Sequence, residues 1–402
     1  MASQSPLLTH SQETVLFGAA LCCLVLLMLP SFGLVRPRGE VLANESRRMA
    51  PFPSLATRDD WNTFPEALEA YFADRFAFRQ ALTTVHHRLL VKLFHRSPSP
   101  KVLLADDGWL FLQGPQGNAI DLYYRNVKPF TAQEIKGIHE EMTRRRKWVE
   151  SWGGKALFVM IPEKESIYPE HLPSIFQRPA NPETRYDQWQ EIVARDPALS
   201  HLDLRPTLRD GKGQGLLYFR GDSHWNSDGA YIGYRELVTS LRKWFPMVSS
   251  VAEPKKTSPK PYQGDLARML AVGDWFDEID LSGHSDAQDG TAPQCAKAVS
   301  ASTGGVPMPE KSEPVVYECA NPALPTAVLI RDSMADHWLP WLPDNFRRLV
   351  VMFNWFPAAR VIEQERPDVV IFENVERTIE QYLHVTLEID PVTKRPTFPW
   401  ER

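Results

Sequence analysis

The sequence predicts an α/β fold in which a mainly parallel sheet is covered by helices on both faces. Short uninterrupted apolar runs recur along the chain, helix-like segments separate them, and some of the runs end directly before polar residues that can carry chemistry. Runs of this length are typical of strands buried on both faces, and their alternation with helices indicates parallel pairing. The predicted strands are residues 156–161, 201–204, 326–330, 349–353 and 368–372.

The segments around these strands show helical periodicity. The clearest helix is predicted over residues 131–152, where Thr131 and Glu134 can form a capping box. Its basic run at 144–147 is predicted to be a solvated face, and contact with a glycan or a lipid is the alternative. Further helices are predicted at 186–194 and 228–245, and apolar residues at intervals of three and four predict helices from residue 59 onward.

This alternation of strands and helices predicts one large α/β domain over residues 59–390. A linker precedes it at 36–58, because that segment is rich in Pro, Arg, Asn and Ser and has little periodicity. A loop insertion rich in Ser, Gly and Pro is predicted at 282–314, and a C-terminal tail at 391–402.

The N-terminal region predicts a membrane anchor at residues 15–35, after a short tail at 1–14. These 21 residues carry no formal charge and would reach about 30 Å as a helix, which is enough to cross a bilayer. A cleaved signal peptide and a buried core helix are the alternatives. The anchor's orientation is in tension with the flanking charge, because the positive-inside rule favours a cytoplasmic domain when the basic residues follow the span, as they do at Arg36, Arg38, Arg47 and Arg48.

Composition narrows the class of protein. The 402 residues are 43% apolar and 24% charged, which is ordinary for a globular protein. The formal net charge of −5 argues against a nucleic-acid partner, and the sequence has neither metal-ligand spacing of His and Cys nor a Gly-rich phosphate loop. We therefore predict no metal and no cofactor. Cys295 and Cys319 bracket a loop-like segment and could form a disulfide or remain free thiols.

The first locus that can carry chemistry is the segment Gly-Asp-Ser-His-Trp-Asn at 221–226. Asp222 and His224 lie two residues apart, so that the carboxylate could orient the imidazole and stabilise its charged form. Such a histidine is a candidate general base. The alternative is that Asp222 only braces the loop and His224 is its satisfied partner.

The second locus follows the strand predicted at 326–330. Ser333 stands at a strand-to-helix turn, where its hydroxyl would be exposed and its own backbone N–H could help to stabilise an oxyanion. The alternative is that Ser333 or Asp332 simply caps the following helix. Together the two loci supply a nucleophile, a base and an orienting carboxylate.

These segments resemble the AlgX/AlgJ-type O-acetyltransferases of bacterial exopolysaccharide secretion, which belong to the SGNH hydrolase-like group. The resemblance covers about residues 60–385 and rests on Gly-Trp-Leu-Phe at 108–111, Pro-Glu-Lys with Tyr-Pro at 162–169, Asp-Ser-His-Trp-Asn at 222–226, Arg-Asp-Ser at 331–333, and the C-terminal signature at 367–377. It implies that Ser333 is the nucleophile, His224 the base and Asp222 the third member. Arg331 departs from the pattern, which has a small residue before Asp-Ser.

The resemblance also implies a setting. The domain would lie in the periplasm, anchored to the inner membrane by residues 15–35, with a polysaccharide as substrate and a multi-pass membrane acyltransferase as the acetyl donor. In that compartment a disulfide between Cys295 and Cys319 becomes plausible. The family's activity implies O-acetylation through an acetyl-serine intermediate. The alternatives are an esterase or deacetylase with the same residues and a non-catalytic glycan-binding subunit of a secretion complex.

Several residues near the two loci are candidates for contact with substrate. Arg331 could bind an anionic sugar, and Asn354 could supply a second oxyanion donor, although an ordinary turn asparagine is the alternative. Tyr218, Trp225 and Trp355 could form a platform for a sugar ring, and each could equally fill the core.

Overall fold

The structure is a computed structural model that describes residues 47–75, 79–114, 118–177, 183–250, 260–276, 278–280, 295–299, 313–390 and 395–401, with a few positions before residue 43. The chain divides into two compact units. Unit 1 comprises residues 1–99 with 268–272, and unit 2 comprises residues 100–267 with 273–402. The domain predicted to start at residue 59 therefore starts at residue 100, because the two helices at 58–94 belong to unit 1.

Unit 1 is built mainly from the helices α2 (Arg58–Arg75) and α3 (Arg79–Phe94), with a short hairpin of β1 (Val41–Leu42) and β2 (Arg47–Arg48). The predicted membrane span at 15–35 lies largely outside the described residues. In the part of the chain that the structure describes, none of the helices is long and apolar enough for a membrane crossing.

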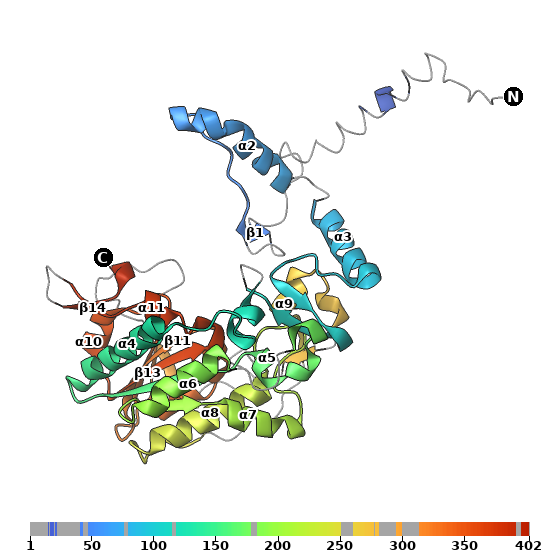
Figure 1. The fold of residues 1–402 in the computed structure, drawn as a ribbon. Coiled ribbons are helices and arrows are strands. Elements are labelled where there is room, and N and C mark those ends of the chain that lie inside the picture. The colour runs from blue at the N-terminus through green and yellow to red at the C-terminus, as the bar shows by residue number, and fades with distance from the viewer. Residues whose placement is uncertain are drawn as a thin grey trace. The chain divides into compact units, whose positions relative to one another are not determined.

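Unit 2 is organised around one seven-stranded sheet (Figure 1). Its strand order is β6-β5-β13-β11-β12-β10-β9. The first five strands are parallel, β10 pairs antiparallel with β12, and β9 pairs antiparallel with β10. The strands are β5 (Lys155–Ile161), β6 (His201–Asp203), β9 (Lys297–Val299), β10 (Val315–Glu318), β11 (Thr326–Arg331), β12 (Arg348–Phe353) and β13 (Val369–Val375). The predicted parallel α/β fold is confirmed for this unit.

Helices cover both faces of this sheet, and alternate residues of one strand show the two layers. In β5, Leu157 and Val159 join the core with α5 (Lys164–Ile167), α7 (Arg205–Gly211) and α8 (Ser227–Arg242), whereas Phe158 and Met160 join the core on the opposite face. The second core contains α4 (Ala132–Glu150), α6 (Arg185–Arg195), α10 (Ala359–Glu365) and α11 (Gln381–His384). The capping box predicted at Thr131 and Glu134 is present.

Three further pairs of antiparallel strands form two-stranded sheets: β3 (Val102–Leu104) with β4 (Leu110–Leu112), β7 (Lys260–Tyr262) with β8 (Glu278–Asp280), and β14 (Glu388–Ile389) with β15 (Pro396–Thr397). The short helix α9 spans Asp265–Met269. The remaining single turns are η2 (Asp106–Gly108), η3 (Ile120–Tyr124), η4 (Pro169–His171), η5 (Ser174–Phe176), η6 (Lys212–Gln214), η7 (Gly273–Trp275), η8 (Met334–Trp338), η9 (Leu342–Asn345), η10 (Glu376–Thr378) and η11 (Pro399–Glu401).

Two sequence boundaries need correction. The insertion predicted at 282–314 contributes the edge strand β9, and the rest of it lies mostly outside the described residues. The tail predicted at 391–402 is partly folded, because β15 pairs with β14 and the Phe398 side chain is completely buried. Cys295 and Cys319 form a disulfide, with the two Cα atoms 5.1 Å apart, which is the first of the two alternatives that the sequence left open.

Candidate active site

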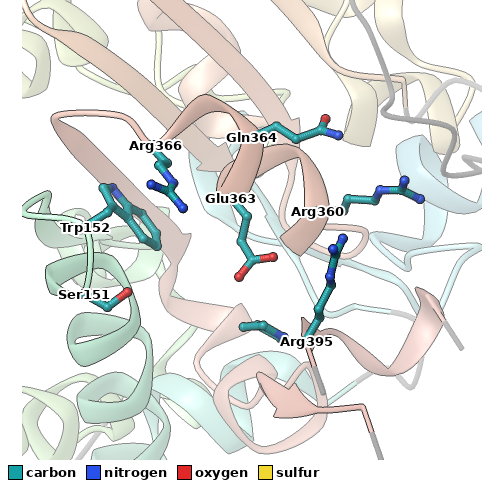
Figure 2. Close-up of a pocket in the computed structure, with 8 residues that line it drawn as sticks. Ser151, Trp152, Arg360, Glu363, Gln364, Arg366 and Arg395 are labelled. Atoms are coloured by element: carbon teal, nitrogen blue, oxygen red, sulfur yellow. The ribbon is translucent and has the colours of Figure 1, made fainter. Parts of the chain in front are cut away.

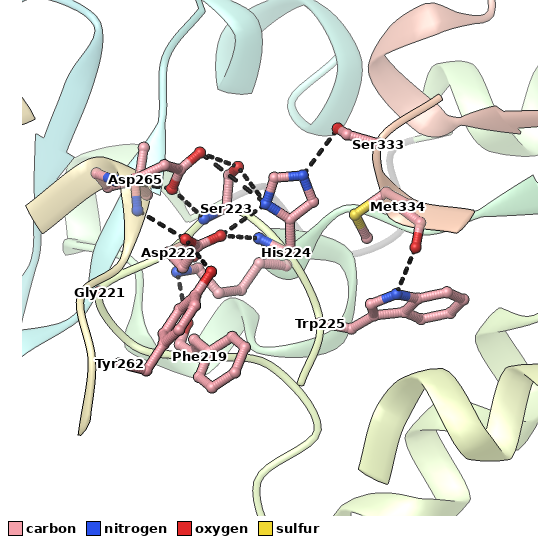
Figure 3. A network of polar contacts seen from close by, with 12 residues as sticks. Phe219, Gly221, Asp222, Ser223, His224, Trp225, Tyr262, Asp265, Ser333 and Met334 are labelled. Atoms are coloured by element: carbon pink, nitrogen blue, oxygen red, sulfur yellow. Dashed lines mark hydrogen bonds and ion pairs between the residues drawn. The ribbon is translucent and has the colours of Figure 1, made fainter. Parts of the chain in front are cut away.

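The candidate site lies at the carboxyl ends of the parallel strands, where α/β proteins present loop residues to ligands. Ser333 follows β11 and begins the turn of η8, and Asp222 and His224 lie in the loop before α8. The His224 Nε2 atom is 2.8 Å from the Ser333 Oγ atom, and the His224 Nδ1 atom is 2.7 Å from an oxygen of Asp222 (Figure 3). The structure therefore brings the three predicted residues into one hydrogen-bonded chain, although His224 and Ser333 are 109 positions apart in the sequence.

The Asp222 carboxylate is buried and accepts hydrogen bonds on both oxygens. One oxygen accepts the His224 backbone N–H and its ring N–H, and the other accepts the Tyr262 hydroxyl at 2.8 Å and the Asp265 backbone N–H at 2.6 Å. Burial opposes ionisation, but the hydrogen bond and charge of His224 and the backbone N–H donors outweigh it, so the pKa of Asp222 lies well below its usual range.

The same contact fixes the state of the histidine. An ionised carboxylate only accepts hydrogen bonds, so Nδ1 of His224 carries the proton and Nε2 is free to accept from the Ser333 hydroxyl. Burial lowers the pKa of His224, and the hydrogen bond and charge of Asp222, with the charge of Asp265, raise it by more. The pKa of His224 is therefore raised above its ordinary 6.5.

Asp265 is a second carboxylate beside the histidine, and the sequence analysis did not identify it. One of its oxygens lies 4.0 Å from Nδ1 of His224 and accepts the Ser223 hydroxyl at 2.6 Å; the other accepts the Ser223 backbone N–H at 2.8 Å. Burial, and then the charge of Asp222, raise the pKa of Asp265. Gly264 permits this approach, because a Cβ atom there would lie 2.1 Å from the Gly221 carbonyl oxygen.

Asp222, His224 and Asp265 are also close enough to share a cation, with ligand atoms within 4.8 Å of one another. Each of these side chains already takes part in the hydrogen bonds just described, and the His224 ring spans the distance from Asp222 to Ser333. The arrangement is thus that of a proton relay more than of an open metal cage.

Lys164 anchors the loop that carries the aspartate and histidine. Its ammonium group is buried and donates to three backbone carbonyls, those of Phe219 at 3.0 Å, Arg220 at 3.1 Å and Asp222 at 2.6 Å. Burial lowers the pKa of Lys164 to about 8, against the opposing charges of nearby carboxylates. Glu278 of β8 also binds the loop that carries Asp222 and His224. Its carboxylate accepts hydrogen bonds from the Gly221 N–H at 3.0 Å and from the Arg220 N–H.

The Ser333 turn offers candidate oxyanion donors. Among the described residues the Ser333 N–H donates no hydrogen bond. Asn354 follows β12, and its own N–H donates to the Arg331 carbonyl at 2.7 Å, which holds it beside the strand that ends at the serine. The Asn354 side chain is buried, and its Nδ2 atom has no partner in the described part of the chain.

Two predicted sugar contacts are wrong. Tyr218 and Trp225 have no exposed surface: the Tyr218 hydroxyl donates to the Pro162 carbonyl at 2.6 Å, and the Trp225 indole N–H donates to the Met334 carbonyl at 2.9 Å. Trp225 thereby joins the histidine loop to the serine turn (Figure 3). Trp355 is 46% exposed and remains available to a sugar.

Arg331 has a partner that the sequence did not indicate. Its guanidinium forms an ion pair with Asp336 at 2.7 Å and donates to the Asp332 carbonyl at 3.2 Å. The positive charge next to the nucleophile is therefore balanced by a carboxylate of the following turn, and it is not an isolated anion site.

The parallel sheet, with serine, histidine and aspartate joined at its carboxyl edge, defines an SGNH hydrolase-like domain. Residues 102–305 match the family described as "SGNH hydrolase-like domain, acetyltransferase AlgX", and the chain belongs to this family. The resemblance inferred from the sequence is confirmed. The match includes Asp222, His224 and Asp265 and ends before Ser333.

The chain is also similar to relatives of known name. The chain is 27% identical over 228 residues to the probable alginate O-acetylase AlgJ of Pseudomonas aeruginosa, which covers 53% of this chain and 52% of that protein. It is 23% identical over 326 residues to the protein of the same name from Pseudomonas putida, covering 78% of each. The chain thus spans about half the length of the first of these relatives. The solved O-acetyltransferase domain of Pseudomonas putida AlgJ aligns with a TM-score of 0.43 at 19% identity, over 69% of this chain and 91% of that one.

Proposed function

We propose that this protein O-acetylates an exported polysaccharide by acyl transfer through Ser333. The observation that carries the proposal is the hydrogen bond of 2.8 Å between the Ser333 hydroxyl and the His224 ring, with Asp222 on the ring's other nitrogen. This is the arrangement that converts a weakly nucleophilic alcohol into an attacking group.

The reaction has two halves. In the first, His224 takes the Ser333 proton as the serine oxygen attacks the acetyl carbonyl, and it returns the proton to the departing donor group, which leaves an acetyl-serine. In the second, His224 takes the proton of a sugar hydroxyl as that oxygen attacks the acetyl carbon, and it returns the proton to Ser333. Asp222 stabilises the imidazolium in both halves.

Negative charge develops on the carbonyl oxygen in each half. We assign its stabilisation to the Ser333 backbone N–H and the Asn354 amide, because both are donors without a partner among the described residues. Trp355 is the proposed platform for the acceptor sugar, since it is exposed and adjoins Asn354 in sequence. Transfer in place of hydrolysis requires that the sugar hydroxyl is better positioned than water.

We further propose that the acetyl donor is presented by a multi-pass membrane acyltransferase, and that residues 15–35 anchor this domain beside it at the inner membrane, facing the periplasm. The apolar length of residues 15–35 and the bonded pair Cys295–Cys319 support this setting, because disulfides persist in oxidising compartments.

Incubation of the protein with a chromogenic acetyl ester, with and without an oligosaccharide, tests the proposal. We expect acetylated oligosaccharide by mass spectrometry, an acetyl group trapped on the peptide that contains Ser333, and loss of both in Ser333→Ala. The exposed Ser174→Ala is the matched control and retains activity. Release of free acetate without acetylated sugar would favour an esterase, and full activity of Ser333→Ala would refute the serine mechanism.

A further inference from the structure

A second candidate binding site lies at the amino ends of the parallel strands, whereas Ser333 lies at their carboxyl ends. It is a depression of about 540 Å³, lined by the end of α4, by α10 and by the residues that precede β15 (Figure 2). Three of its lining side chains are arginines, Arg360, Arg366 and Arg395, and we call it the arginine pocket. Its volume is within the range of sites for small ligands.

The pocket carries an excess of positive charge. Glu363 is the one acidic side chain among its lining residues, and Arg360 and Arg366 alone already outnumber it. Figure 2 shows Glu363 between Arg366 on one side and Arg360 and Arg395 on the other. In the described part of the chain, neither Arg360 nor Arg366 forms an ion pair with a carboxylate. Like charges brought together in a recess attract an anion from solution.

This distribution differs from that of the basic run at 144–147, which the sequence analysis predicted to be a solvated face. There Arg144 and Arg145 both pair with Glu141, and Arg146 pairs with Glu150 at 2.6 Å. Each of these arginines is thus paired within its own helix, whereas Arg360 and Arg366 of the arginine pocket form no ion pair in the described part of the chain.

The aromatic member of the pocket is held in a fixed orientation. The Trp152 indole N–H donates to the Pro367 carbonyl at 3.1 Å, and its ring packs edge-on against Trp148 with centroids 5.4 Å apart. The side chain remains partly exposed. An aromatic surface beside planar guanidinium groups suits a sugar ring that bears a carboxylate, because arginine binds carboxylates through two parallel hydrogen bonds.

The pocket is separated from the catalytic residues by the length of the sheet. Trp152 precedes β5 and Arg366 precedes β13, so both lie at the amino ends of strands whose carboxyl ends face Ser333. Each strand has seven residues, which is about 20 Å. A ligand in the arginine pocket is therefore not the group that reacts at Ser333.

We propose that the arginine pocket binds carboxylate groups of an acidic glycan strand and holds the polymer to the enzyme away from the reacting hydroxyl. The inference rests on the proposed function for the choice of a glycan, and on the pocket itself for the choice of an acidic one. It assigns a local preference for polyanions to a chain whose overall net charge is −5.

The test is a titration of the full chain with a short oligouronate and with the same oligosaccharide after reduction of its carboxyl groups to alcohols. We expect binding of the oligouronate that weakens with added salt, and little binding of the reduced form. In the variant Arg360→Gln/Arg366→Gln/Arg395→Gln the dissociation constant should rise at least about tenfold. Equal binding of the two oligosaccharides, or unchanged binding by the variant, would overturn the proposal.

The matched control is Arg195→Gln/Arg235→Gln/Arg242→Gln, which removes the same charge from exposed arginines of α6 and α8. It should bind the oligouronate as the unmodified chain does, and a tenfold loss there would show only general charge attraction and reject the pocket. Vesicles containing phosphatidylglycerol are a further probe. Binding of these vesicles without binding of the oligouronate would overturn the proposal and identify a lipid surface, not a glycan, as the ligand of the arginine pocket.

The titration needs no acetyl transfer, so its failure is distinguishable from failure of the proposed function. Ser333→Ala should bind the oligouronate normally. Turnover of a small acetyl ester should be the same in the pocket variant and in the unmodified chain, while the KM for a uronate polymer rises and kcat is retained. A fall in small-ester turnover would mean that the arginines support the fold or the catalytic residues, against the proposal.

Discussion

The two segments that meet in the candidate active site are held in different ways. The serine turn continues directly from the buried strand β11, and Asp332 fixes it by accepting the N–H groups of Met334 and Val375 at 2.8 and 2.7 Å. The loop with Asp222 and His224 follows no strand of the main sheet. It is held from outside itself, by Lys164 after β5 and by Asp265 and Glu278 from a separate part of the chain.

The serine turn therefore has a rigid support, whereas the support of the histidine loop is adjustable. The position of the nucleophile is set by the sheet, whereas the position and charge of the base depend on buried ionisable groups around its loop. Substitutions around the histidine loop should therefore change activity and its pH dependence, and substitutions behind the serine should act mainly on stability.

The largest effect is expected for Asp222→Asn. An amide can offer an N–H toward Nδ1 and so favours the wrong histidine tautomer, and it cannot stabilise the imidazolium. We expect kcat for a small acetyl ester to fall about 10⁴-fold, the size seen for loss of the aspartate in other triads. A fall of less than tenfold would mean that Asp222 serves only the loop.

The same residues predict a pH dependence. Because Asp222 and Asp265 raise the pKa of His224 above 6.5, activity should rise with pH through a value above 6.5, as the ring becomes neutral. The interaction of charged His224 with these two carboxylates contributes its full stability to the fold below pH 6.5. This contribution is lost as pH rises through the folded pKa of His224. For Asp222 the sign is reversed: its contribution is present above pH 3.8 and is lost as pH falls through its lowered pKa. Steady-state rates across a range of pH measure the predicted dependence of activity, and urea unfolding across the same range measures the predicted dependence of stability.

Lys164→Met should give the next largest effect. It leaves three carbonyls of the histidine loop without their donor, which we expect to cost about 2–3 kcal/mol of unfolding free energy and to lower kcat about 10²-fold through misplacement of the imidazole. The control is Lys212→Met, whose ammonium group is partly exposed and holds the Ile167 carbonyl and Glu170. Equal losses in the two variants would show that Lys164 is no special anchor.

Asp265→Asn tests the second carboxylate with a smaller effect. Removal of a negative charge beside the His224 ring should lower the pKa of the ring and so shift the acid limb of the pH–rate profile toward lower pH. The ring should also be positioned less well, by about the free energy of one hydrogen bond, which should lower the rate about fivefold. Ser223→Ala removes the hydroxyl contact and keeps the charge, so it should leave the acid limb in place. If both variants shift the profile equally, the charge of Asp265 is not the cause.

The sequence predicted the parts of the site that depend on local pattern. Asp222, His224 and Ser333 were found because a short polar motif and the end of an apolar strand are both visible along the chain. Their meeting across 109 positions is a property of the parallel sheet, which brings strand ends to one edge.

The supporting groups could not be predicted in the same way. Asp265 and Glu278 belong to three-residue strands and a single helical turn without periodicity, so nothing in the sequence placed them beside His224. Tyr218 and Trp225 show the limit for aromatic residues, since a ring next to a motif can face either substrate or core. The domain boundary was misplaced because the periodicity of residues 58–94 is the same whichever unit those helices pack with.

The smallest effect is expected behind the serine, at Glu373. This side chain is completely buried, and burial, followed by the charge of Asp332, raises its pKa well above the usual range. The site therefore favours the neutral form of this side chain, so Glu373→Gln, which keeps the size and can still accept the Asp332 N–H, should change the unfolding free energy by less than about 1 kcal/mol and kcat by less than about twofold. Asp332→Asn should instead cost about 2 kcal/mol, because both carboxylate oxygens hold backbone N–H groups of the turn. If Glu373→Gln proves as costly as Asp332→Asn in urea unfolding, the charge behind the serine is on Glu373, and the rigid support of the nucleophile is as dependent on buried charge as the histidine loop.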